Sequence, residues 1–235
     1  MMYRMAYEYQ FDSEKCWYKE VCNHYGTNKC YPGCLRFMEM HYLMNNSGIP
    51  AKCQYQIDLY PEDEDLDAFM QLKEIKDNII NFVEQGCSLY LYSENTGNGK
   101  TSWAIKLMKK YFDSVWAGNG FRCRGVFIHV PTFLTKIKEG ISRKDEDFEL
   151  LRSRLLEADI VIWDDIASGK LGDFDHTNLI TYIDQRKLNR LSNIYTGNIG
   201  GEQLSEALGV RLASRVWKDS LQVEIMGADR RGFRL

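Results

Sequence analysis

The residues best suited to chemistry form a glycine-rich run that ends in a lysine and a threonine, ENTGNGKT at residues 94–101. The glycines would let backbone N–H groups turn toward a phosphate with no Cβ atom in the way. Lys100 would then reach the β- and γ-phosphates of a nucleoside triphosphate, and the hydroxyl of Thr101 would ligate Mg²⁺. One position departs from the usual motif, because Glu94 stands where a first glycine is expected. The run predicts an ATP/ADP site formed by Thr96, Gly97, Asn98, Gly99, Lys100, Thr101 and Ser102.

Two adjacent carboxylates, Asp164 and Asp165, follow an apolar run, IVIW at residues 160–163. At the end of a buried strand beside the phosphate loop, Asp164 would hold Mg²⁺ together with Thr101. Asp165 would orient and deprotonate the attacking water. A pair of surface acids at a strand end is the alternative. The position of the pair, one strand and several helical segments after the phosphate loop, favours the catalytic interpretation.

Polar residues further along the chain extend this set. Asn198 follows a predicted strand and would hydrogen-bond the γ-phosphate or the water, and a turn-forming residue is the alternative. Arg211 and Arg215 lie one helical turn apart and share a face. An arginine directed at a neighbour's nucleotide makes hydrolysis depend on assembly, whereas a solvated arginine does not. Arg230 and Arg231 would touch the phosphates of their own site or lie on the surface.

Apolar patterns predict the elements that must position these groups. Short apolar runs indicate strands at residues 88–93, 125–130, 159–163, 193–196 and 221–226. Helical spacing indicates helices at residues 68–85, 101–112, 175–188, 203–208 and 210–217, and helical segments within 132–156. Strands that alternate with helices predict an α/β fold with a parallel sheet covered by helices on both faces. Ligands bind such sheets at the carboxyl ends of the strands.

The first part of the chain carries a second candidate site. Four cysteines, Cys16, Cys22, Cys30 and Cys34, could form a zinc site with four thiolate ligands, although their spacings are wider than those of the usual C-x2-C pairs. Further candidate ligands are His24, His41 and Cys53. Free buried thiols and an iron–sulfur cluster are the alternatives. Zinc would stabilise a segment too small to hold a core of its own.

The composition is that of a soluble globular protein with enough apolar residues to form a core. The chain has 235 residues, 44% of them hydrophobic, and a net charge of -3, so no overall basic field indicates nucleic-acid binding. No apolar run approaches the roughly 18 residues that cross a bilayer, and the first residues lack a signal core. We therefore expect a cytoplasmic protein with no membrane partner. An acidic run at 61–67 predicts a boundary between a small N-terminal domain, residues 1–65, and a larger domain, residues 66–235.

The chain resembles the DnaC/DnaI family of bacterial helicase loaders, a branch of the AAA+ ATPases close to the IstB transposition ATPases. The resemblance rests on the runs GNGKTSWAIKL, ADIVIWDDI, YTGN, RLASRVW and GADRR, between about residues 89 and 231. It implies a P-loop NTPase fold (AAA+/RecA-like) and a zinc-binding N-terminal domain that touches the helicase. The cysteine-bearing layout looks most like phage-encoded versions, which would act in the cytoplasm of a bacterial host.

The resemblance also implies roles for single residues. Asp164 looks like the Walker B acid that holds Mg²⁺, and Asp165 takes the position of the catalytic acid. Asn198 looks like sensor 1, Arg215 like the arginine finger and Arg231 like sensor 2. Arg186 lies where the family often has an arginine, and we leave its role open.

The implied function is ATP-dependent loading of a hexameric DnaB-type replicative helicase onto single-stranded DNA during replication. Self-association would bring the arginine finger to a neighbour's site. Phe133, Lys136 and Lys138 are candidate DNA contacts, because an aromatic among basic residues suits stacking and phosphate binding. Two other functions are considered: an IstB-like transposition or regulatory ATPase on duplex DNA, and a non-catalytic module that blocks a helicase or loader. The intact phosphate loop and acids argue against the latter.

Overall fold

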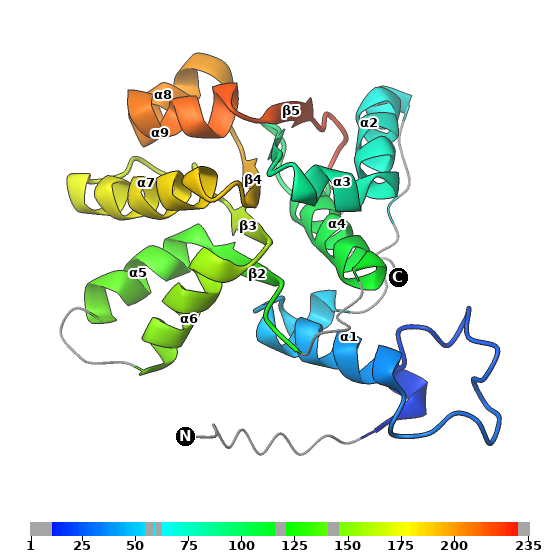
Figure 1. Ribbon diagram of the computed structural model, residues 1–235. Coiled ribbons are helices and arrows are strands. Elements are labelled where there is room, and N and C mark those ends of the chain that lie inside the picture. The colour runs from blue at the N-terminus through cyan, green and yellow to red at the C-terminus, as the bar shows by residue number, and fades with distance from the viewer. Residues whose placement is uncertain (1–10, 55–58, 60–62, 116–120, 141–145, 230–235) are drawn as a thin grey trace.

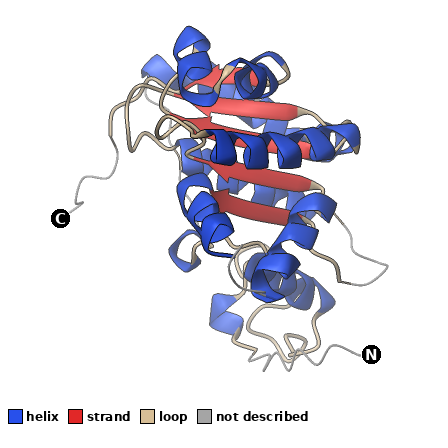
Figure 2. Ribbon diagram, turned by 90° about the vertical axis from the view of Figure 1, so that its left-hand side faces the viewer, coloured by secondary structure: helices blue, strands red, loops and turns tan. Residues whose placement is uncertain are grey.

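A five-stranded sheet forms the centre of the protein in a computed structural model that describes residues 11–54, 59, 63–115, 121–140 and 146–229. Each strand runs parallel to its neighbours, in the order β2-β3-β4-β1-β5 (Figure 2). The strands are β1 Ser88–Tyr92, β2 Gly125–His129, β3 Ile160–Asp164, β4 Ser192–Gly197 and β5 Leu221–Glu224. All five predicted strands are confirmed to within two residues at each end.

Helices cover both faces of the sheet, as predicted (Figure 1). One face packs against α1 Leu35–Asn46, α2 Leu66–Asp77, α3 Ile79–Glu84 and α4 Lys100–Ser114. The other face packs against α5 Val130–Gly140, α6 Glu146–Glu157, α7 Asp173–Leu188, α8 Gly201–Leu208 and α9 Val210–Ala213. The central strands β3 and β4 are buried along their whole length. This explains the apolar run IVIW in β3, whereas β4 also buries the polar residues Ser192, Asn193 and Thr196.

Strand register brings the polar strand ends together. Tyr92 at the end of β1 lies beside Gly197 at the end of β4, and Trp163 of β3 lies beside Tyr195 of β4. The residues that follow these strands therefore meet at one edge of the sheet. This edge is where an open parallel sheet binds its ligands.

Two helices differ from their predicted form. Residues 68–85 do not form one helix, because Asn78 leaves the helical conformation and donates from its side chain to Glu74 O at 3.1 Å. An asparagine amide competes with the backbone in this way and favours helix ends. Residues 210–217 begin as α9, but the next turn, Ser214–Lys218, is a π-helix. Within the described residues, no helix is both long and apolar enough to cross a membrane.

The N-terminal part of the described chain packs on the body of the protein. Met40, Leu43 and Met44 of α1 share an apolar cluster with residues of α4 and the sheet. Phe127 of the edge strand β2 donates its backbone N–H to Ser47 O at 2.7 Å, which covers an edge that would otherwise pair with another strand. The boundary near residue 65 stays a prediction about domain organisation.

Candidate nucleotide site

The phosphate loop joins the end of β1 to the start of α4. Gly97 and Gly99 have φ angles of 73° and 106°, in the left-handed region that side chains disfavour. A Cβ atom on Gly97 would lie 1.8 Å from Asp229 Oδ1, so the space over this glycine is also closed to a side chain. The fifteen-residue helix α4 begins directly at Lys100, and the partial positive charge of its N-terminus favours an anion.

The side chain of Lys100 is buried and folds back onto the phosphate loop. Its Nζ donates to Asn95 O at 2.7 Å and to Asn98 Oδ1 at 3.1 Å. Asn98 is held in turn, because its Nδ2 donates to Ser93 Oγ at 2.7 Å and to Ile225 O at 2.6 Å. The loop therefore surrounds the ammonium group of Lys100 with its own oxygen acceptors, and phosphate binding by this group stays a prediction.

Hydroxyl and carboxylate oxygens converge beside the loop. Thr101 Oγ1 donates to Asp164 Oδ1 at 2.7 Å, and Thr196 Oγ1 donates to the same oxygen at 2.8 Å. Three elements, α4, β3 and β4, thus contribute to one small group. Hard oxygen donors of this kind are the ligands that Mg²⁺ prefers, so the donor set of Thr101 and Asp164 fits a magnesium ion.

Sequence reasoning missed Thr196. Its register position on β4, one residue beyond the pair of Trp163 and Tyr195, places it beside Asp164. It also accepts a hydrogen bond from the backbone N–H of Asp165 at 2.9 Å. The signal that could have identified it is the threonine at the end of a predicted strand adjacent to the acidic one.

Asp165 adopts a φ of 59°, which is unusual for a residue other than glycine. Such conformations cost about 1 kcal/mol or more and gather at functional sites. β3 ends at Asp164, and the backbone N–H of Ile166, two residues later, donates to Thr196 O of β4 at 2.9 Å. Asn198, directly after β4, is half-buried at the same edge of the sheet. Their catalytic roles stay predictions.

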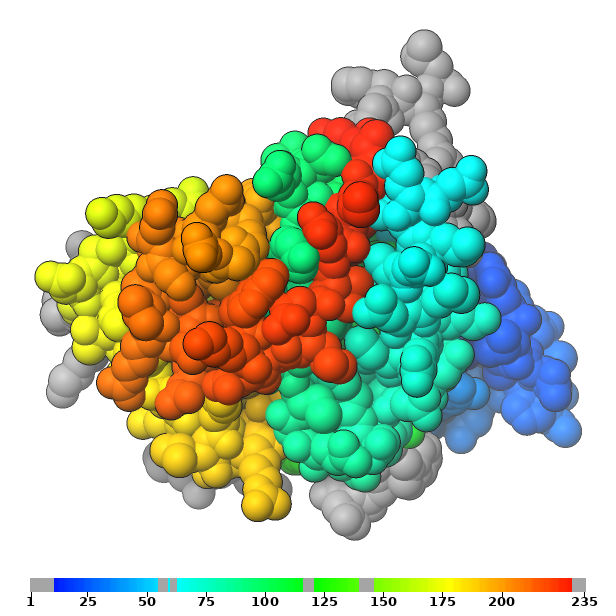
Figure 3. Space-filling model, turned by 90° about the horizontal axis from the view of Figure 1, so that it is seen from above, coloured from blue at the N-terminus to red at the C-terminus, as the bar shows by residue number. Residues whose placement is uncertain are grey.

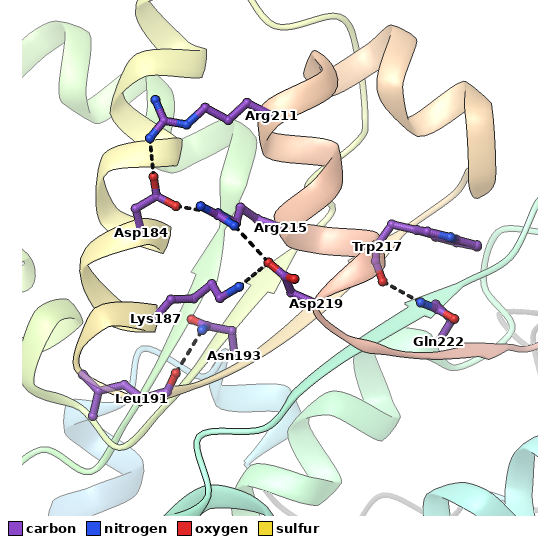
Figure 4. A network of polar contacts seen from close by, with 9 residues as sticks. All are labelled: Asp184, Lys187, Leu191, Asn193, Arg211, Arg215, Trp217, Asp219 and Gln222. Atoms are coloured by element: carbon purple, nitrogen blue, oxygen red, sulfur yellow. Dashed lines mark hydrogen bonds and ion pairs between the residues drawn. The ribbon is translucent and has the colours of Figure 1, made fainter.

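The predicted arginine finger belongs to an ion network on α7 and the π-helical turn (Figure 4). Arg215 Nε contacts Asp184 Oδ1 at 2.8 Å and its Nη1 contacts Asp219 Oδ2 at 3.3 Å. Arg211 shares Asp184 at 2.7 Å, and Lys187 shares Asp219. The hydrogen bond to Asp184 raises the pKa of Arg215. Partial burial opposes ionisation of Asp219, but its bonds to Lys187 and Arg215 hold its pKa below the usual value.

Arg186, whose role the sequence left open, is fully buried away from the nucleotide site. Its guanidinium donates to Leu155 O at 2.6 Å, Ala158 O at 2.9 Å, Ser192 O at 2.6 Å and Asn193 Oδ1 at 2.8 Å. Burial lowers its pKa to about 9, which leaves it protonated at neutral pH. These contacts tie the end of α6 to the start of β4, so the role of Arg186 is structural.

One candidate DNA contact is wrong. Phe133 is 3% exposed and packs edge-on against Trp163 and Tyr182, because the helical spacing of α5 directs it into the core. It is therefore not free to stack on a base. Lys138 is exposed and pairs with Asp175 at 2.7 Å, while Lys136 is exposed. Arg230 and Arg231 lie outside the described residues.

The structure does not support the zinc site. Cys16, Cys22, Cys30 and Cys34 are free thiols and partly buried. Across the described ranges, no group of three or more His, Cys, Asp or Glu side chains is arranged to hold a metal ion. Burial raises the pKa of Cys16, and the charges of Cys34, Cys22 and Cys30 raise it further. The spacings are wider than those of tight zinc knuckles, and the chain between them does not bring the sulfurs into one coordination sphere.

Solved structures match this architecture, whereas no family model and no curated protein sequence matches the chain. The DnaC helicase loader aligns with a TM-score of 0.59 at 20% identity, over 71% of this chain and 93% of that chain. The protein has the fold of DnaC. DnaI aligns with a TM-score of 0.57 at 17% identity, over 75% of this chain and 88% of that chain.

The DnaC-like fold also extends to replication initiators. AMPPCP-bound DnaA from Aquifex aeolicus aligns with a TM-score of 0.55 at 16% identity, over 71% of this chain and 48% of that chain. Together with the strand order, these likenesses confirm the predicted fold, a parallel sheet with helices on both faces like that of DnaC and DnaA.

Proposed function

We propose that the protein is an ATPase that loads a DnaB-type replicative helicase onto single-stranded DNA. The observation that carries the proposal is the convergence of Lys100, Thr101 and Asp164 at one edge of a sheet with the DnaC fold. The loop would supply backbone N–H groups and the ammonium group of Lys100 for the phosphates. The hydroxyl and the carboxylate supply oxygen ligands for Mg²⁺, which would neutralise charge on the β- and γ-phosphate oxygens.

Hydrolysis then requires a positioned water. Asp165, directed out of the strand by its left-handed backbone, accepts a proton from the water as the water oxygen bonds to the γ-phosphorus. The bond between the γ-phosphorus and the β–γ bridging oxygen breaks, and ADP and phosphate leave. Asn198, at the end of the adjacent strand, hydrogen-bonds the γ-phosphate or the water. Lys100 and the helix N-terminus stabilise the charge on the phosphates.

Self-association would complete the site. Arg215 is 37% exposed in its side chain, but two carboxylates hold it within its own subunit. Three cations and two anions form this network, so it keeps a positive excess that suits the triphosphate of a neighbour. In an assembly, Arg215 would exchange part of its contact with Asp184 for the γ-phosphate, which makes turnover depend on assembly.

The partners are proposed from the structural likeness. DnaC is described as a helicase loader, and a DnaA structure of the same fold contains both AMPPCP and single-stranded DNA. That DnaA aligns with a TM-score of 0.57 at 15% identity. These likenesses support a hexameric helicase and single-stranded DNA as partners of this chain, and the exposed Lys136 stays a candidate DNA contact.

The proposal is tested by ATP hydrolysis measured with and without single-stranded DNA and a DnaB-type helicase. Wild-type turnover should rise with both partners, and Lys100→Ala and Arg215→Ala should each lose it. Because Arg215 acts on a neighbour, a mixture of the two variants should recover part of the activity. Pull-down of a transposase instead of a helicase would support the IstB-like alternative, and folded protein that fails to bind ATP with Mg²⁺ would refute both.

A further inference from the structure

The chain that follows β5 runs along the outside of the phosphate loop. We call residues 225–229 the post-β5 segment. Two of its carbonyls accept hydrogen bonds from the loop: Asn98 Nδ2 donates to Ile225 O at 2.6 Å, and Asn95 Nδ2 donates to Met226 O at 2.9 Å. The loop is thus attached to a segment about 130 residues later in the chain.

A single carboxylate holds this segment from its other side. Asp65 Oδ1 accepts the backbone N–H groups of Met226 at 2.7 Å and Gly227 at 3.0 Å. Asp65 is 4% exposed and lies immediately before α2. Hydrogen bonds to an ionised acceptor are about twice as strong as neutral ones, so this is a firm attachment.

A continuous path of hydrogen bonds therefore links the start of α2 to the catalytic lysine. Asp65 binds the amides of the post-β5 segment, the carbonyls of that segment bind Asn95 and Asn98, and Asn98 Oδ1 accepts from Lys100 Nζ. In Figure 3 the red segment after β5 lies between the cyan of α2 and the green of the chain that follows β1. The helix itself packs on α4, since Phe69 contacts Trp103 edge-on at 5.2 Å.

We propose that Asp65 is a positioning residue that sets the place of Lys100 through the post-β5 segment. Asp65 stands where the N-terminal part of the chain joins the ATPase body, so a partner bound to the N-terminal part can act on nucleotide affinity through it. The inference rests on the proposed ATPase function. It adds to that function a route by which the two parts of the chain communicate.

The test compares variants at the start of α2. Asp65→Ala removes the acceptor for two amides, whereas Asp65→Asn keeps a side-chain oxygen that can accept both. Asp67→Ala removes an exposed acid from the first turn of the same helix and controls for the helix dipole. ATP affinity is measured with Mg²⁺ by calorimetry, and hydrogen exchange of the amides at residues 94–101 is measured without nucleotide.

Asp65→Ala should weaken ATP binding roughly tenfold, because both hydrogen bonds to the post-β5 segment are lost and part of that loss reaches Lys100. Its loop amides should exchange faster, and Asp65→Asn and Asp67→Ala should stay within about twofold of wild type in affinity. Asn95→Ala cuts the same path at an exposed position. In the double variant Asp65→Ala/Asn95→Ala, the loss of ATP-binding free energy should be smaller than the sum of the losses in the two single variants.

Wild-type affinity and loop exchange in Asp65→Ala would overturn the inference. The inference would also fail if Asp65→Asn lost as much ATP affinity as Asp65→Ala while the amides of residues 94–101 exchanged at the wild-type rate. That result would show that Asp65 acts through its negative charge and not through the hydrogen-bond path. If Asp65→Ala does not fold, Asn95→Ala decides the matter, because wild-type ATP affinity and loop exchange in that variant would overturn the inference. A wild-type protein that binds no ATP defeats the proposed function instead, and the exchange measurement then continues to test the hydrogen-bond path.

Discussion

Thr196→Val isolates the residue that joins the two acids at the end of β3. The hydroxyl of Thr196 donates to Asp164 Oδ1 at 2.8 Å and accepts from Asp165 N at 2.9 Å, and the residue is 2% exposed. Valine keeps the shape but removes both hydrogen bonds. One of them involves a carboxylate and the other leaves a backbone N–H without this partner, so unfolding should become easier by about 2–3 kcal/mol.

Catalysis should suffer more than binding. Without the hydroxyl, Asp164 can turn away from Thr101, and Asp165 loses the contact that supports its left-handed backbone. Misplacement of this kind should lower kcat on the order of 10²-fold. Lys100 and the glycines are untouched, so the dissociation constant for ATP should change by less than about threefold.

The assay combines steady-state ATP hydrolysis, equilibrium nucleotide binding and urea denaturation. Thr181→Val is the matched control. Thr181 lies on the exposed side of α7, and its hydroxyl donates to a carbonyl of the same helix, Thr177 O, at 2.7 Å. That variant should keep wild-type turnover. If Thr196→Val also turns over ATP at the wild-type rate, Thr196 does not position the acids and the reasoning from strand register fails.

Three further predictions concern other groups. Asp184→Ala should release Arg211 and free Arg215 from one of its two carboxylates, which should raise assembly-dependent hydrolysis roughly fivefold. The cost in stability should be only about 1 kcal/mol, because the pairs are partly screened by solvent, and unchanged hydrolysis on assembly would count against sequestration of Arg215. Arg186→Met should lower the unfolding free energy by about 4 kcal/mol, because several buried carbonyls lose their donor; denaturation within 1 kcal/mol or so of wild type would contradict the structural role. Asp229→Ala removes a carboxylate that lies against Gly97 and should tighten ATP binding roughly fivefold at low salt, and weaker binding in calorimetry would show instead that Asp229 supports the loop.

Much of the fold and of the nucleotide site follows from local sequence. The phosphate loop, the acidic strand end and the five strands are each specified by neighbouring residues: glycines with positive φ, apolar runs of about five, and polar residues at their ends. The helix boundaries were less predictable. Asn78 divides one expected helix, because its side chain bonds the backbone, and the π-helical turn at Arg215 has no local signal that we identified.

Side-chain environments also escaped local reasoning. Phe133 suited stacking because Lys136 and Lys138 follow it, yet its place on the helix directs it into the core against Trp163. The cysteine spacing suggested zinc, yet the thiols of the described chain do not form a metal-binding group. In both cases the residue type was informative, but the packing partner that decides its role comes from a distant part of the chain.

The sequence by itself determined that a phosphate loop, a pair of acids and a parallel sheet exist, because those features depend on residues within a few positions of one another. The tertiary structure alone decided which groups meet. Thr196 reaches Asp164 through strand register, and Asp65 reaches the phosphate loop through a segment 161 residues further along the chain. Such pairs depend on how strands and helices pack, and no local pattern of residue types encodes the distance between their atoms.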